Sequence, residues 1–252
     1  MKNCVAVLTR GYTNISSYQK LIKRNNDINK NLKNKDIDCL IFHEGNISEE
    51  HQIYIQEKTP ELRLIFINVN NGLAFKKEKN SISHSKESSR WGGTGYRHMC
   101  AFWFTQFLDF TKDYDKLLRI DEDCYINFSI DQQFETLEKY IFVCGRWEKE
   151  DYPFVTRGLL QISIDIFKCE NHVLYGPYTN VTGFNLQNIR ESIKNNSIVN
   201  TYIDTIYEKD GIYEHRWGDH VLWGELIVNF YGMSSVKIDV LHYFHESHNL
   251  QL

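Results

Sequence analysis

Short apolar runs separated by amphipathic segments make up the first part of the chain. Three runs are apolar almost throughout, as in strands buried on both faces of a sheet: residues 4–9, 37–43 and 62–69. Between them, residues 14–33 place apolar side chains near helical spacing, and residues 48–57 show a shorter helical pattern with Ser48 as its predicted N-cap. The order strand–helix–strand–helix–strand predicts a parallel sheet covered by helices, with right-handed crossovers.

The next stretch, residues 70–93, is polar, rich in lysine and serine, and without periodicity, so we expect a long loop. Thr94 is the predicted cap of a following helix, whose apolar face carries Met99, Trp103, Phe107 and Phe110. Later patterns predict a strand at 141–144, a half-buried strand at 159–167, a loop at 170–183, helices at 185–207 and 217–231, and a last strand at 236–244. No internal repeat or linker separates them, so a single domain over residues 1–252 is expected.

One apolar run, Leu117 to Ile120, ends abruptly in three carboxylates, Asp121-Glu-Asp123. A buried strand has this pattern where it leaves a sheet and carries acids to the site at its carboxyl end. In an extended segment, Asp121 and Asp123 would project to the same side. Two such oxygen ligands suit Mg²⁺ or Mn²⁺, and a cation held there could neutralise the diphosphate of a nucleotide sugar as it leaves.

The spacing of these acids has an alternative explanation. Asp-x-Asp also occurs at residues 36–38 and 113–115, where the first precedes an apolar run and the second lies in a polar turn. Only the pair at 121 and 123 follows a buried-strand pattern. A solvated acidic turn, with Asp123 beginning the next segment, would give the same spacing.

Composition limits the classes of function. Apolar residues make up 42% of the 252 positions and aromatic residues 14%, as in a globular protein. The formal net charge is -4 and no long basic run occurs, which argues against nucleic-acid binding.

The cysteines and the N-terminus bear on the compartment. None of the six cysteines forms a C-x-x-C pair, and four lie in apolar segments, which argues against a zinc ribbon and favours a reducing compartment. The first apolar run is too short for a signal peptide or a membrane span. We therefore expect a soluble cytoplasmic protein without a membrane span, the cytosol of a virus-infected cell included.

Three stretches together resemble one family: Gly95-Tyr-Arg-His-Met-Cys-Ala-Phe102, Arg119-Ile-Asp-Glu-Asp123 and Tyr213-Glu-His-Arg-Trp-Gly-Asp219. In this order they are similar to motifs of the fungal α-1,2-mannosyltransferases of the Kre2/Mnt1 type, glycosyltransferase family 15. The resemblance spans about residues 4–245, most of it weakly similar, and would make this chain a divergent soluble member. The first stretch is the most specific of the three.

The resemblance implies a fold and an activity. The fold would be the α/β GT-A glycosyltransferase fold, with a Rossmann-like, mostly parallel central sheet flanked by helices. A nucleotide-binding half would cover about residues 1–125 and an acceptor half about residues 126–252. The activity would be metal-dependent transfer of a mannose-like sugar, with retention, from a GDP-mannose-like donor to a glycan or glycoprotein acceptor.

The resemblance also implies a metal site. Asp121 takes the place of a glutamate of the family and Asp123 matches its aspartate, so both remain candidate ligands of Mn²⁺ or Mg²⁺. A histidine near the C-terminus would join them. Alignment on the preceding tyrosine selects His245, and His242 is the alternative.

Four further positions are carried over from the family. Tyr96 and Arg97 match residues near the donor diphosphate, where both would stabilise the charge of the leaving phosphate. Arg10, at the end of the first strand, matches an arginine near the nucleotide. Asp219 matches an acid on the acceptor side. Tyr96 and Asp219 are thus candidate catalytic residues.

One departure concerns the mechanism. The chain has Phe184-Asn185 where the family has Phe-Glu, and an asparagine cannot be the covalent nucleophile. We expect Asn185 beside the sugar, with retention and no covalent intermediate, or else a different sugar or an inactive protein. Two other functions stay open: a non-catalytic protein that binds nucleotide sugar or glycan, and a metal-dependent phosphohydrolase.

Overall fold

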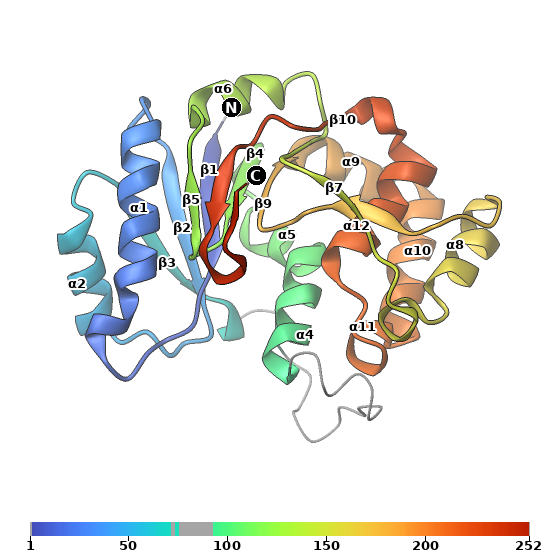
Figure 1. Cartoon of the computed structure of the whole chain (residues 1–252), viewed down its shortest axis with the longest axis horizontal. Helices are drawn as coiled ribbons and strands as arrows, with labels where there is room; N and C mark the ends of the chain where they lie inside the picture. Colours follow the sequence, from blue (N-terminus) through green and yellow to red (C-terminus); the bar gives the residue numbers. More distant parts are fainter. Residues whose placement is uncertain (1, 72–73, 76–92, 252) are drawn as a thin grey trace.

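The computed structural model describes residues 2–71, 74–75 and 93–251. At its centre lies a seven-stranded sheet in the order β10-β6-β9-β4-β1-β2-β3 (Figure 1). Its strands are β1 (Asn3–Leu8), β2 (Asp38–His43), β3 (Arg63–Asn68), β4 (Lys116–Ile120), β6 (Phe142–Cys144), β9 (Val181–Asn185) and β10 (Val236–Lys237). Only β9 runs antiparallel to its neighbours, so the expected mostly parallel α/β sheet is confirmed.

β1 and β2 are buried almost throughout because both faces of the sheet are covered there, whereas β3, at the edge of the sheet, is half-buried. In β1, Cys4 and Ala6 pack into the core beneath the aromatic helix that follows residue 93. Val7 on the other face packs against helices α1 (Gln19–Asn31) and α2 (Glu49–Lys58), which stand on the left in Figure 1. Ser48 caps α2 by accepting a hydrogen bond from the His51 backbone N–H, as predicted.

Helices also cover the rest of the sheet. They are α4 (Thr94–Ala101), α5 (Phe107–Phe110), α6 (Ile130–Thr136), α7 (Pro153–Thr156), α8 (Leu159–Phe167), α9 (Leu186–Asn195), α10 (Ser197–Glu208), α11 (Gly211–Glu214) and α12 (Asp219–Leu226). Turns of π-helix continue α4 at Phe102–Gln106 and α12 at Ile227–Tyr231, and 3-10 turns lie at Ile15–Tyr18, Val69–Asn71, Met233–Ser235 and Glu246–His248. Among the described residues, no helix is both long and apolar enough to cross a membrane.

Two small sheets lie outside the main one. β5 (Cys124–Ile126) pairs with β11 (Tyr243–His245), which also pairs with β12 (Leu250–Gln251). β7 (Trp147–Lys149) pairs with β8 (Tyr175–Pro177). The first of these sheets brings the C-terminal segment back over the end of β4.

Several predicted elements differ in the structure. Residues 159–167 form a helix, because Leu159, Ile162 and Ile166 recur at helical spacing and pack into the core. The helix predicted at 185–207 is two helices, since Asn196 accepts hydrogen bonds from the N–H groups of residues 198 and 199 and begins a new one.

Three further corrections concern helix starts, strands and loops. Gly93 is the N-cap of α4, and Thr94 is its first residue rather than its cap. The predicted loop at 170–183 contains β8 and the start of β9, and the last strand is divided into β10 and β11. Most of the loop predicted at 70–93 lies outside the described residues.

The segment between α8 and β8 is attached to α12 through His172. Its Nε2 atom lies 3.0 Å from Oε1 of the buried Glu225, and its Nδ1 atom lies 2.8 Å from the carbonyl oxygen of Glu170. Both partners are acceptors when Glu225 is ionised, so the ring must carry both protons. Burial alone would lower the pKa of His172, but these two bonds outweigh it and raise the pKa.

This raised pKa predicts a pH-dependent contribution to stability. The contribution is fully present below the ordinary histidine pKa of about 6.5 and is lost as pH rises through the higher folded value. The difference in unfolding free energy between wild type and His172→Gln should therefore be larger at about pH 6 than at about pH 9 in urea titrations. His242→Gln, at an exposed position, is the control. An equal difference at both pH values would contradict the assignment.

Candidate active site

The three acids follow β4 at the carboxyl edge of the sheet, as the apolar run predicted. They lie in a turn rather than an extended segment, because the Cys124 N–H donates to the Asp121 carbonyl over 3.1 Å. Glu122, between the two aspartates, accepts hydrogen bonds from Thr9 Oγ1 and, over 2.7 Å, from Tyr12 Oη. The turn is therefore fixed to the end of β1, and it is not a solvated acidic turn.

Arg119 binds Asp121 and Asp219 at once. Its Nε and Nη2 atoms lie 2.8 and 2.9 Å from the two Asp121 carboxylate oxygens, and Nη1 lies 2.7 Å from Asp219 Oδ2. The guanidinium is 2% exposed and lies over the Trp103 ring at 4.6 Å. Asn180 Nδ2 adds a bond of 3.1 Å to Asp121. Burial raises the pKa of Asp121, and Arg119 opposes that rise.

Asp123 faces the C-terminal segment instead. Its carboxylate lies 3.4 Å from His245 Nε2 and accepts a hydrogen bond from Ser247 Oγ. Burial alone would raise the pKa of Asp123, but the bonds from His245 and Ser247 reverse this and lower the pKa well below its usual range. Asp123 is therefore a carboxylate at neutral pH, which is the form that binds a metal.

Among the residues that the structure describes, Asp123, Cys124 and His245 form a cluster that could hold a metal ion. One ligand atom from each lies within 4.8 Å of the others. The pairing of β5 with β11 sets Cys124 opposite His245, whose Nδ1 lies 3.1 Å from Tyr178 Oη. Of the two candidate histidines, His245 is thus the one beside Asp123, whereas His242 is exposed. Asp121 is not part of this cluster.

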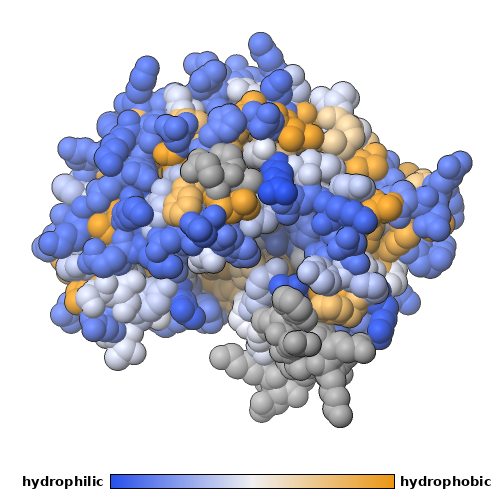
Figure 2. Space-filling view, viewed as in Figure 1, coloured by the Kyte–Doolittle hydropathy of each residue, from blue (hydrophilic) through white to orange (hydrophobic). Residues whose placement is uncertain are grey.

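Two hollows of about 430 Å³ each meet at this edge of the sheet. The first is lined by residues from the ends of β1, β2 and β4, among them Arg10, Glu44 and Asp123. The second is lined by Asp219, Arg216 and residues of β7, α7 and the segment before β9. Tyr96, Met99 and Asp121 line both. Figure 2 shows a hollow near the centre of a largely hydrophilic face.

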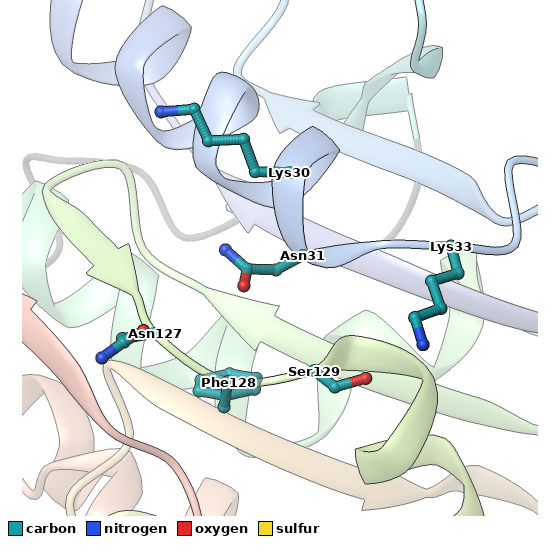
Figure 3. Close-up of a pocket in the computed structure, with 6 residues that line it drawn as sticks. All are labelled: Lys30, Asn31, Lys33, Asn127, Phe128 and Ser129. Carbon is teal, nitrogen blue, oxygen red and sulfur yellow. The ribbon is translucent and has the colours of Figure 1, made fainter.

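A third hollow, of about 320 Å³, lies where α1 ends, on the side of the sheet away from the acids (Figure 3). Its lining includes no carboxylate: Lys30, Asn31, Lys33, Asn127, Phe128 and Ser129. Figure 3 shows the side chains of Lys30 and Lys33 extending in different directions. Converging reactive groups are therefore found at the carboxyl edge, not here.

The predicted position of Arg97 is wrong. Its side chain is buried, its Nε atom donates to the Tyr213 carbonyl over 2.9 Å, and it lines neither hollow. The arginine beside Tyr96 is instead Arg216, whose Cζ atom lies 4.0 Å from the Tyr96 ring centroid. Sequence reasoning missed Arg216, although it lies within the matched stretch Arg-Trp-Gly-Asp.

The predicted position of Asn185 is also wrong. β9 runs antiparallel to β4, with Asn185 paired to Lys116 and Val181 to Ile120. Asn185 therefore lies at the opposite edge of the sheet from the acids. There it caps α9, accepting from Asn188 N over 3.1 Å and donating to the Leu137 carbonyl over 2.8 Å. The amide at the site belongs to Asn180, just before the same strand.

Comparison with known proteins identifies the fold. No protein-family model and no curated protein sequence matches the chain. Solved structures do: the mannosyltransferase Ktr4p from S. cerevisiae superposes with a TM-score of 0.76 at 16% identity, over 97% of this chain and 70% of that one. The protein has the GT-A fold of glycosyltransferases. The resemblance to Kre2/Mnt1-type mannosyltransferases is thus supported at the level of the fold, not as membership of the family.

Other GT-A structures are similar as well. Core-mannan synthase A (CmsA/Ktr4) from Aspergillus fumigatus, in its Mn/GDP form, has a TM-score of 0.71 at 13% identity, over 97% of this chain and 74% of that one. Mouse xyloside xylosyltransferase 1 has a TM-score of 0.60 at 11% identity, over 94% of this chain and 85% of that one. Transferases of different sugars therefore share this arrangement of strands and helices.

The position of Asn185 predicts a structural rather than a catalytic effect. Asn185→Ala removes an N-cap and leaves the Leu137 carbonyl without its donor, which should lower the unfolding free energy by about 2 kcal/mol. If the chain binds GDP with Mn²⁺, calorimetry should give the same affinity for Asn185→Ala as for wild type. Asn180→Ala, the matched amide at the site, should weaken that binding. If Asn185→Ala weakened the binding and Asn180→Ala did not, Asn185 would have to lie at the site.

Proposed function

We propose that this protein is a metal-dependent glycosyltransferase that moves a mannose-like sugar from a GDP-sugar to a hydroxyl of a glycan or glycoprotein. The observation that carries the proposal is the Asp123–His245 pair, beside two connected hollows at the carboxyl edge of a GT-A sheet. In open α/β sheets, ligands bind at this edge. The two hollows offer room for a donor and an acceptor.

The donor belongs in the first hollow. All its lining residues lie between positions 8 and 123, which supports a nucleotide-binding half of about residues 1–125. Arg10 is available there for the nucleotide, and Asp121 lies beside Asp123 where it can reach the ribose or a metal-bound water. The similar structures include one in an Mn/GDP form and one in complex with GDP, which supports Mn²⁺ and a guanine nucleotide.

Asp123 and His245 would hold the Mn²⁺ or Mg²⁺ ion. A carboxylate and an imidazole are a suitable pair of ligands for Mn²⁺. Burial and then the nearby Asp121 and Asp123 raise the pKa of the Cys124 thiol strongly. The ion would supply positive charge to the donor diphosphate.

The acceptor belongs in the second hollow. Its lining residues come mostly from positions 119–248, which supports an acceptor half of about residues 126–252. Asp219, oriented by Arg119, is the carboxylate that we assign to the acceptor side. Tyr96 separates the two hollows and lies where the sugar would pass between them. The resemblance to retaining mannosyltransferases supports retention, and the position of Asn185 removes it from that step.

The alternative of a non-catalytic binding protein loses its main argument, because Asn185 is not at the site. A phosphohydrolase would use the same carboxylates, and its products distinguish it. All six cysteines are free, which supports action in a reducing compartment such as the cytosol.

The metal assignment predicts the effect of three substitutions. Asp123→Ala and His245→Ala should each weaken Mn²⁺-dependent GDP binding by about 100-fold or more, because loss of a ligand exceeds the effect of changing its supporting groups. His242→Ala, the exposed alternative, should leave the affinity unchanged. Calorimetry with and without Mn²⁺ measures all three. Equal effects at His242 and His245 would refute the assignment.

The activity itself is tested with GDP-mannose, Mn²⁺ and a mannose-terminated oligosaccharide. Transfer should release GDP and extend the oligosaccharide, as chromatography and mass spectrometry would show. A panel of other nucleotide sugars, ranked by thermal shift, identifies the donor if GDP-mannose is not accepted. Release of inorganic phosphate from simple esters, without sugar transfer, would favour the phosphohydrolase.

A further inference from the structure

Arg216 is held in an unusual backbone conformation beside the second hollow. It lies between α11 and α12 with φ of 62°, in the left-handed region that side chains other than glycine rarely adopt. The next residue, Trp217, is anchored: its N–H donates to the Gly211 carbonyl over 3.2 Å and its Nε1 to the Arg157 carbonyl over 3.1 Å. Strained residues of this kind gather at functional sites.

The guanidinium of Arg216 forms no direct ion pair with a residue that the structure describes, although its charge acts on Glu150: burial raises the pKa of that carboxyl, and Arg216 opposes the rise. Its guanidinium lies over the Tyr96 ring, and its buried Nε atom has no hydrogen-bond partner there. Three of the carboxylates that line the same hollow are paired with other arginines: Asp219 and Asp121 with Arg119, and Glu148 with Arg146. The fourth, Glu150, accepts a hydrogen bond from the Tyr152 N–H. A half-buried guanidinium that lines a hollow without a direct ion pair marks a place for an anion.

The position of Arg216 relates it to the metal site. Tyr96 lines both hollows, and the guanidinium lies 4.0 Å from the centroid of its ring, on the side of the second hollow. A diphosphate bound at Asp123 and His245 would extend towards Tyr96 when its sugar enters the second hollow. The planar donors of a guanidinium match the oxygens of a phosphate.

We propose that Arg216, positioned by Tyr96, binds the terminal phosphate of the donor and stabilises it as the leaving group. This inference rests on the proposed transferase function. In the reaction, the bond from the anomeric carbon to the phosphate oxygen breaks and its electron pair stays on that oxygen. The acceptor oxygen bonds to the anomeric carbon, and its proton passes to the released phosphate. Arg216 thus takes the role that the sequence suggested for Arg97.

The test compares nucleoside diphosphates with monophosphates, using the full chain with Mn²⁺. Calorimetry gives the affinities of GDP and GMP, and of UDP and UMP, for wild type, Arg216→Gln and Arg216→Lys. In Arg216→Gln, the affinity for the diphosphate should fall by about 10- to 100-fold, because a charge-assisted hydrogen bond is lost. The affinity for the monophosphate should fall much less. Arg216→Lys should recover part of the loss.

Arg63→Gln is the matched control, since Arg63 is exposed, pairs with Asp38, and neither of these two residues lines either hollow. It removes the same charge and should leave the diphosphate affinity unchanged. Thermal unfolding of each variant without ligand shows whether the fold is kept. For sugar transfer, Arg216→Gln should lower kcat more than it raises KM.

The possible results distinguish failure of the proposed function from failure of the role assigned to Arg216. If wild type binds neither diphosphate in the presence of Mn²⁺, the proposed function fails and this inference fails with it. If wild type binds one of them and Arg216→Gln binds it equally well, only the role of Arg216 is refuted. Equal loss of diphosphate and monophosphate in a folded variant would also refute it, because Arg216 would then shape the pocket without contacting the terminal phosphate.

Discussion

The candidate site depends on one buried cation, Arg119. It joins Asp121, at the end of β4, to Asp219, at the start of α12, through three hydrogen bonds of 2.7 to 2.9 Å. These residues come from segments a hundred positions apart, so a single side chain fixes the first part of the site relative to the second. Removing one partner of such a buried network typically costs about 3–5 kcal/mol, because charges are left uncompensated.

Much of the sheet could be predicted because its signals are local. β1 and β2 are buried on both faces and show as apolar runs, as does the half-buried edge strand β3. β4 ends where its carboxylates begin. Leu159–Phe167 was mistaken for a strand because its isoleucines alternate while also satisfying a helical period. The break at Asn196 was missed because an asparagine in a polar stretch is compatible with both a helix surface and a cap.

The site could be predicted where residues follow a strand directly, as Asp121 and Asp123 do, or where they lie in a matched motif, as Tyr96 and Asp219 do. Asn185 was misplaced because sequence does not show that β9 runs antiparallel to β4, and this direction sends Asn185 to the far edge. Sequence also does not show that β5 pairs with β11, and this pairing places His245 rather than His242 beside Asp123. Arg97 and Arg216 are both near Tyr96, and only packing shows that Arg97 binds a backbone carbonyl while Arg216 lies over the ring.

The central claim is that Asp123 and His245 form a metal site at the carboxyl edge of this sheet. Its most direct test is X-ray diffraction from crystals grown with MnCl₂ and GDP, recorded where manganese scatters anomalously. The account predicts an anomalous peak between the Asp123 carboxylate and the His245 imidazole, with the diphosphate oxygens beside it. A manganese peak at another cluster of acids, with GDP bound and no peak at Asp123, would contradict it.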